Sequence, residues 1–288
     1  FSDGSTRTQW CNPRLWNLYR GNSGGPYVLE CALMAFEHWM FEVADAYPEQ
    51  LDPLLLSILK RSDTGALSAV VASIATAHPH KSGESLLVLL SAKDYVLLDR
   101  GRFATDYSGA SVAGLVPMGD PMNRVYAEER KRANARSHRR SDLEAAILNL
   151  QLGPLAGRVQ AAIDRHLSEV PPMDQQGEYD RLWRIALRRM DLRFYTAEEI
   201  HPQAKTTDAT DEGKESAGVQ LVLNLNIPDQ DLQKVSAEST AKHLEFADRL
   251  GLEMWGIKVF AHEDEVIYPP AQWHERLKQA MTFEEDSA

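Results

Sequence analysis

The chain has few cysteines and no long apolar segment, and both absences narrow what it can be. Its two cysteines, Cys11 and Cys31, do not have the spacing of a metal site or of a catalytic dithiol. Two isolated thiols in 288 residues are typical of a reducing compartment, so we expect a cytoplasmic protein. No apolar run approaches the roughly 18–20 residues that cross a bilayer, so we expect no membrane partner. The first residues, FSDGSTRTQW, show neither a signal pattern nor an initiating Met, and we expect a piece of a longer protein.

Basic residues are outnumbered by acidic ones, 31 against 42, which gives a formal net charge of −11. Nucleic acid repels a protein of this overall charge, so general nucleic-acid binding is not expected. A local basic surface is still compatible with this balance. With 288 residues, of which 43% are hydrophobic, the chain is long enough to bury a sizeable core.

One short segment matches a catalytic signature, and its context argues against catalysis. GNSGGP, within Arg20–Pro26, is nearly the nucleophile signature of trypsin-like serine proteases. Those enzymes need a His base and an Asp that precede the serine, and none of the 22 residues before Ser23 is His. The residues after Pro26 have a helical period, whereas the protease continues into a strand. We therefore expect a loop that caps the next helix; a hydrolase that uses Ser23 is the alternative.

The remaining motifs do not predict a nucleotide or metal site. DEGKES, around Gly213–Lys214, lacks the spacing of a phosphate-binding loop, and its acidic neighbours would repel phosphate. The nine histidines are scattered, and neither HPH at His78–His80 nor AHEDE at Ala261–Glu265 brings several ligands to one point. We expect no metal, no cofactor and no catalytic residue, and so no enzyme in this chain.

Helical periodicity dominates the sequence from Pro26 onward. Apolar residues recur at i, i+3, i+4 and i+7 over four turns, which indicates one amphipathic helix that ends at Pro48. Its apolar positions are Val28, Leu29, Ala32, Leu33, Phe36, Trp39, Met40 and Val43. Three shorter apolar segments follow: LDPLLLSILKR, TGALSAVVASIATAHP and GESLLVLLSA.

These four segments contain an internal repeat. Ala35–Leu59 aligns with Ala66–Leu90 at an offset of 31 residues, and ADAYP before the second segment matches ATAHP before the fourth. His78 then occupies the position of Tyr47, which predicts a structural role at a helix end. A helix pair repeated at this period is typical of an α-solenoid or a related helical stack, as in HEAT or tetratricopeptide proteins. The predicted fold is therefore all-α, built from helix hairpins.

The second half of the chain continues the helical pattern. We expect residues 1–118 to form the N-terminal repeats and residues 119–288 a C-terminal helical region continuous with them as one array. Ala104–Pro121 reads as a loop, and Ser141 and Glu144 have capping-box spacing at the start of a helix. Further helices are expected over 155–167, 179–190 with Trp183 in the core, 229–251 and 270–281. Alternation from Val219 to Leu225 indicates either one short strand without a visible partner or an extended connector.

Two groups of arginines stand out in this acidic chain. One lies on a charged helix over residues 124–140, and the other follows Trp183. As a partner-binding surface we predict Arg130, Arg132, Arg136, Arg139, Arg140, Arg188 and Arg189. The expected partner is a protein, or another domain of a parent chain. Nucleic-acid binding through the 124–140 helix and a plain solvated helix face are the alternatives.

Several of these segments also resemble a known family. LYRGNSGGPYVLECALMAFEHWMFEVADAYP, VVASIATAHP, RGRFATD, RSDLEAAILNLQ and YDRLWRIALRRMDLR are similar to helical regions of large bacterial STAND or NACHT-like ATP-binding proteins, including those of antiviral defence. The resemblance covers roughly Leu18–Arg193. It implies a sensor or scaffold whose ATP site and effector chemistry lie in other domains, and no nucleotide-binding residue carries over. We expect a non-catalytic module of such a bacterial defence or regulatory protein.

Overall fold

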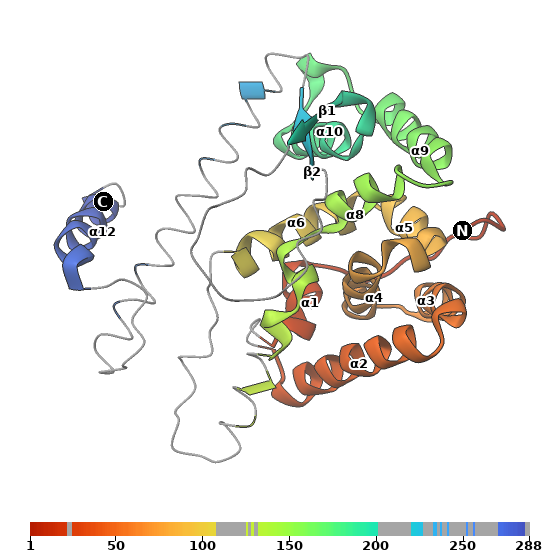
Figure 1. Ribbon diagram of the computed structural model, residues 1–288, viewed down its shortest axis with the longest axis horizontal. Helices are drawn as coiled ribbons and strands as arrows, with labels where there is room; N and C mark the ends of the chain where they lie inside the picture. Colours follow the sequence, from red (N-terminus) through yellow and green to blue (C-terminus); the bar gives the residue numbers. More distant parts are fainter. Residues whose placement is uncertain are drawn as a thin grey trace, which may run out of the picture.

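The computed structural model describes residues 1–21, 25–107, 132–200, 220–226 and 270–285, and isolated positions at 125, 128, 129, 233, 234, 237, 241, 252 and 256. This part of the chain is mostly helical and has one short two-stranded sheet (Figure 1). The prediction of a mostly helical fold is therefore confirmed, and the one short strand that the sequence allowed belongs to a two-stranded sheet. The expected domain division near residue 118, the expected helix over 229–251 and Ser23 lie at or among residues outside this description.

The four repeat segments form two helix hairpins. Helix α2 spans Tyr27–Ala46 and α3 spans Pro48–Arg61, while α4 spans Gly65–Ala77 and α5 spans Gly83–Leu90. Helix α2 packs against α4, and α3 packs against α5, so one hairpin lies on the other. Helix α4 is central and almost entirely buried, whereas α2 lies at one edge of the helical body (Figure 1).

The two hairpins turn in the same way at Tyr47 and His78. Both residues end a helix in nearly the same backbone conformation, with φ and ψ of −137° and 61° at Tyr47 and of −130° and 57° at His78. Each backbone N–H donates to the carbonyl four residues earlier, at 2.8 Å and 3.0 Å. A proline follows each of them and begins the next helical segment, because its ring fixes φ and needs no donor there. The helix-end role predicted for His78 is confirmed.

Helix α3 supplies the cap of α5. The Asp52 carboxylate accepts hydrogen bonds from the backbone N–H groups of Glu84 and Ser85, at 3.0 Å and 2.9 Å. These are donors of the first helical turn, which have no partner within their own helix. A carboxylate at this end also complements the helix dipole. The contact therefore fixes the stagger between α3 and α5.

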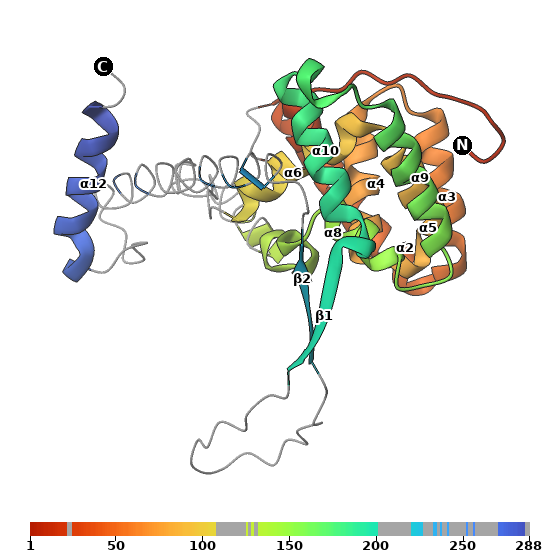
Figure 2. The same ribbon diagram turned by 90° about the horizontal axis from the view of Figure 1, so that it is seen from above.

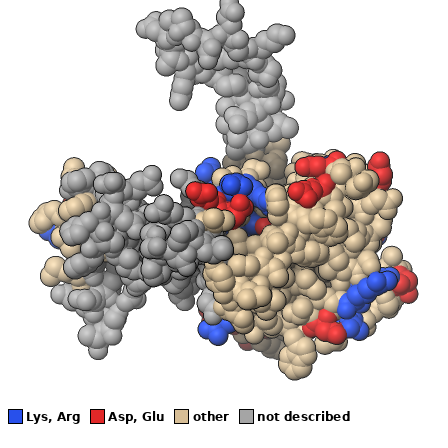
Figure 3. Space-filling model, turned by 90° about the horizontal axis from the view of Figure 1, so that it is seen from below, with Lys and Arg blue, Asp and Glu red and all other residues tan. Residues whose placement is uncertain are grey.

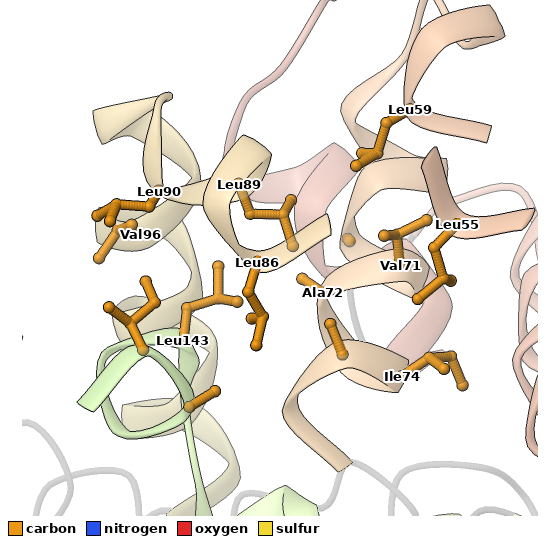
Figure 4. Close-up of a cluster of buried hydrophobic side chains, with 14 of the residues drawn as sticks. Leu55, Leu59, Val71, Ala72, Ile74, Leu86, Leu89, Leu90, Val96 and Leu143 are labelled. Atoms are coloured by element: carbon orange, nitrogen blue, oxygen red, sulfur yellow. The ribbon is translucent and has the colours of Figure 1, made fainter. Parts of the chain in front are cut away.

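The other described elements complete the helical part of the fold. They are α1 (Pro13–Asn17), α6 (Lys93–Tyr107), α8 (Leu143–Leu150), α9 (Ala156–Glu169), α10 (Glu178–Met190) and α12 (Trp273–Glu285), with short 3-10 turns η1 (Leu18–Arg20), η2 (Pro79–Lys81), η4 (Ser137–Arg140), η5 (Met173–Gln175), η6 (Leu192–Phe194) and η7 (Pro270–Gln272). One hydrophobic cluster runs from Trp16 to Met190 and includes Trp183, as predicted. Figure 4 shows its centre, where α3, α4, α5, α6 and α8 meet.

Two predicted boundaries are wrong by a few residues. The cap of α8 is Asp142, whose carboxylate accepts from the Ala145 N–H at 2.9 Å, and Ser141 lies outside the helix. Glu144 does not complete a capping box, because Arg189 holds its carboxylate. Helix α6 extends to Tyr107, so Ala104–Tyr107 of the predicted loop is helical.

The predicted lone strand has a partner. Strand β2 (Gln220–Leu225) pairs antiparallel with β1 (Tyr195–Ile200), with Tyr195 opposite Leu225 and Ile200 opposite Gln220. The Tyr195 hydroxyl donates to the Arg189 carbonyl at 2.6 Å, which anchors the root of the ribbon to α10. From there the ribbon projects away from the helices (Figure 2).

Within the described residues, no helix has both the length and the apolar character needed to span a lipid bilayer.

The Asp52 cap gives a test of the hairpin stacking. We expect Asp52→Ala to lower the free energy of unfolding by about 1 kcal/mol, because two N–H donors of α5 lose their acceptor. Urea denaturation measures the change, and Asp174→Ala, at an exposed position, is the matched control. An equal effect of both substitutions would show that Asp52 does not cap α5.

Candidate functional site

Two predicted arginines of the first group, Arg139 and Arg140, lie in η4, which packs against α4 and α6, and Arg139 reaches Glu37 of α2. The short turn forms because Arg136 leaves the helical conformation and the following residues close a 3-10 turn, with the Arg139 N–H donating to the Arg136 carbonyl at 3.1 Å. This turn directs its arginines to opposite sides. Arg139 points into the protein, whereas Arg140 remains at the surface.

Arg139 is a buried residue and not part of the surface. It is only 3% exposed, and its guanidinium donates to both oxygens of Glu37 on α2, with 2.6 Å between Nη2 and Oε1. Its Nη1 also donates to the Ser73 hydroxyl of α4 at 3.3 Å. Burial lowers the pKa of Arg139, and the Glu37 charge opposes that shift. Because the guanidinium is buried and its acceptors lie inside the fold, Arg139 is not accessible to a partner.

A second buried ion network continues from this one toward α6. Arg20 donates to Asp106 at 2.8 Å, and Arg102 bridges Asp106 and Asp99 at 2.9 Å and 2.7 Å. Burial raises the pKa of Asp106, but the neighbouring arginine charges, chiefly that of Arg20, outweigh this effect and hold the pKa below its usual value. Asp99 also accepts from the Leu143 N–H at 2.8 Å, which ties α6 to the start of α8. Two arginines and two aspartates thus neutralise each other inside the protein, so we assign these pairs a structural role.

Arg132 and Arg140 are exposed, and Arg136 lies partly buried beside them, 3.6 Å from Glu37. The Arg136 guanidinium stacks over the Phe41 ring at 4.2 Å and lies 2.9 Å from the His38 ring nitrogen of α2. Arg132 is largely exposed and lies 2.9 Å from Glu129. We name these three residues the basic edge. It borders the side of α2 that carries His38.

The remaining predicted contact residues are placed differently. Arg189 is held by Glu144 through two hydrogen bonds of 2.6 Å and 2.7 Å, so it fixes α10 to α8. Arg188 lies over the Phe194 ring at 4.5 Å. Arg130 and Ser23 lie outside the described residues. The structure therefore does not bring the two predicted arginine groups together as one surface.

Ser73 and His138 form a serine–histidine contact that sequence spacing does not predict. Their Oγ and Nε2 atoms are 3.1 Å apart, and both side chains are buried. The Ser73 hydroxyl donates to Glu37, so the imidazole must donate to the serine oxygen, which is the reverse of a catalytic pair. Burial, followed by the charges of Arg139 and Arg136, lowers the pKa of His138 to about 2. Such an imidazole cannot take up a proton near neutral pH, so it is unsuited to act as a general base.

The acidic partners of these arginines are what the sequence analysis missed. Glu37 lies between Leu33 and Met40 on the buried side of α2. Asp99 is also buried, although the charged residues around it in α6 show no pattern that marks it as such. A buried position for Glu37 has no local signal, since isolated acidic residues on helices are usually exposed. Within the described ranges, no cluster of three or more His, Cys, Asp or Glu side chains could hold a metal ion.

Removing one partner of the buried pair gives the first test of this site. We expect Arg139→Met to lower the free energy of unfolding by about 3–5 kcal/mol, because the Glu37 carboxylate is left buried without its counter-ion. Adding Glu37→Gln to Arg139→Met should recover part of that loss. Thermal and urea denaturation measure it, and Arg132→Met, at the exposed edge, should change stability by less than about 0.5 kcal/mol. A mild effect of Arg139→Met would contradict the buried pair.

The low pKa of His138 gives a second test. Below the ordinary pKa of about 6.5, the unfolded chain binds a proton that the folded chain does not bind, so stability falls as the pH falls. Between about pH 7 and about pH 5.5 this residue should cost roughly 1 kcal/mol. We expect His138→Gln to flatten that part of the stability profile, measured by urea denaturation. The same substitution at the exposed His274 should leave the profile unchanged, and equal slopes in all three proteins would contradict the prediction.

No protein-family model matches the chain, and no curated protein matches it. Its function is therefore inferred from its own residues and their arrangement.

Proposed function

We propose that the chain is a non-catalytic helical-repeat scaffold or sensor module that binds a protein partner. The observation that carries this proposal is the basic edge, which presents Arg132 and Arg140 at the surface while Arg139 fixes the turn beneath them. A rigid base limits the conformational entropy that an interface must lose on binding. Exposed arginines on such a base are typical of interface hot spots.

Two further features support a scaffold over an enzyme. Ser73 and His138 are hydrogen-bonded in the reverse sense of a catalytic pair, and the pKa of His138 is about 2. The two hairpins, α2–α3 and α4–α5, stack with matching turns, which is the arrangement from which an α-solenoid is built. We propose that this stacking is a segment of such an array, and that the array belongs to a larger bacterial ATP-binding defence or regulatory protein in the cytoplasm.

A protein partner fits the basic edge better than nucleic acid does. Arg132 lies against Glu129, and the neighbouring side of α2 presents Glu42, whose side chain is exposed. Acidic groups so close to the arginines weaken the attraction for a phosphate backbone, whereas a protein surface can match both signs.

Charge reversal at the basic edge tests the proposal. We expect the pair Arg132→Glu and Arg140→Glu to weaken partner binding by at least about tenfold, since both side chains lie at the surface. Arg139 is left unchanged, because reversing a buried charge beside Glu37 would unfold the protein. The partner is isolated from bacterial lysate on the immobilised chain and then titrated against wild type and variants by calorimetry.

The exposed Arg181, on α10, provides the control. Arg181→Glu should leave affinity unchanged, and denaturation should show that every variant is folded. Equal affinity of the wild type and the double variant would remove the basic edge from the proposal. Tight, steeply salt-dependent binding to a 20-base-pair DNA duplex, lost on the same double reversal, would favour nucleic-acid binding instead.

A further inference from the structure

Helix α2 exposes an apolar face. Between Tyr27 and Phe41 its only acidic or basic side chains besides His38 are Glu30 and Glu37, and both of these point inward. Val28 is 80% exposed and Trp39 is 48% exposed.

Val28, Ala32, Ala35 and Trp39 follow helical spacing along one stripe, with Leu29 exposed beside it. Figure 3 views the molecule from the side on which α2 lies. A broad area without Lys, Arg, Asp or Glu faces the viewer, and charged side chains gather at its rim. Helices bury an apolar stripe of this kind.

The relation between α2 and α4 shows what such a face packs against. At the offset of 31 residues, Glu42 of α2 corresponds to Ser73 of α4, and Glu37 corresponds to Ser68. Ser73 lies on the side of α4 that α2 covers, because its hydroxyl donates to Glu37. Ser68 lies on the other side of α4 and donates to Gln9 at 2.6 Å. Helix α4 thus has one side for the preceding repeat helix and an opposite side for the rest of the fold.

Under the repeat alignment, the exposed side of α2 corresponds to the side of α4 that α2 covers. Val70 of α4, which corresponds to Trp39, is completely buried, whereas Trp39 is half exposed. We infer that the exposed face of α2 is the docking site for one α-helix of the protein partner, which packs on α2 as α2 packs on α4. The inference rests on the proposed function and names the surface and the kind of partner.

The charges at this face define the chemistry of the partner helix. The Glu42 side chain is 66% exposed, and its ion-pair partner, His38 at 3.7 Å, is charged only when protonated. Asp45 is exposed on the next turn. A Lys or Arg on the docked helix, opposite Glu42, would match this acidic end. Ala32 and Ala35 let the helix approach closely, and Trp39 supplies the aromatic anchor that interfaces favour. The partner is therefore a helix with an apolar stripe and a basic residue at its edge.

A synthetic helix derived from the chain itself tests the inference. The probe is a fluorescent peptide of residues 27–46 that carries Glu37→Lys, because residue 37 of α2 faces the α4 residue that corresponds to Glu42. We expect saturable binding to the full chain by fluorescence anisotropy, and about fivefold weaker binding of the peptide with Glu at position 37. Glu42→Lys in the protein should reverse this preference.

Two tryptophan variants locate the binding. Trp39→Glu should weaken peptide binding by at least about tenfold. Trp10→Glu, at a tryptophan that is 83% exposed on another segment, should leave it unchanged. Thermal denaturation checks that both variants fold. Binding that ignores Trp39→Glu would mean that the peptide replaces α2 or binds elsewhere, and it would overturn the inference, as would the absence of binding.

Sedimentation of the full chain tests a second occupant. A concentration-dependent dimer that Trp39→Glu abolishes would assign the face to a second copy and overturn the inference.

The isolated partner separates this inference from the proposed function. A partner whose affinity depends on Arg132 and Arg140 but ignores Trp39→Glu would leave the proposed function standing and remove the docking site. If no partner binds at the basic edge while the peptide still binds at α2, the proposed function is removed and the docking site stands.

Discussion

The buried pair between Glu37 and Arg139 determines how the N-terminal hairpin sits on the rest of the protein. It joins α2 to η4, and the Ser73 hydroxyl brings α4 into the same network. Burying two charges costs solvation that their mutual attraction barely recovers, so the pair adds little net stability over an apolar contact. Its effect is to exclude other arrangements: any shift of α2 along α4 leaves a carboxylate or a guanidinium buried and unpaired. This constraint, together with the contacts of Arg136 to Phe41 and His38, holds the basic edge beside α2.

Local sequence signals predicted the elements but not their partners. The helices and the matching turns at Tyr47 and His78 depend on apolar period and on proline, and both act over a few residues. Whether an arginine is exposed or buried depends on an acid that is distant along the chain. Glu37 lies 102 residues from Arg139. Strand β1 was missed for the same reason, because YTAEEI alternates weakly and becomes a strand only by pairing with β2.

The periodicity of α2 could not show which side of the helix is buried. Its apolar positions cover more than half of the circumference. The sequence pattern therefore indicated an amphipathic helix without showing which of these positions face the core. The structure divides these positions: Leu33 and Met40 enter the core, whereas Val28 and Trp39 remain outside. Glu37 enters with the first pair, and it can do so because Arg139 and Ser73 meet it there. Helix α2 thus buries a carboxylate among its core residues while Val28 and Trp39 stay outside, and the long-range pair with Arg139 compensates the charge of Glu37.

The two sides of the hairpin stack differ in how far they are covered by the rest of the protein. On the far side of α4, Ser68 and Tyr95 are both hydrogen-bonded to Gln9 of the N-terminal segment, which covers that side. On the near side, α2 still exposes Val28 and Trp39, and burying a side chain of this size is worth about 1.5–3 kcal/mol. The basic edge borders this face at His38, so charge and apolar area lie within reach of one docked helix. Arginines steer and orient a partner while apolar contacts supply most of the affinity, so the proposed function and the proposed docking site would use the two surfaces as parts of one interface.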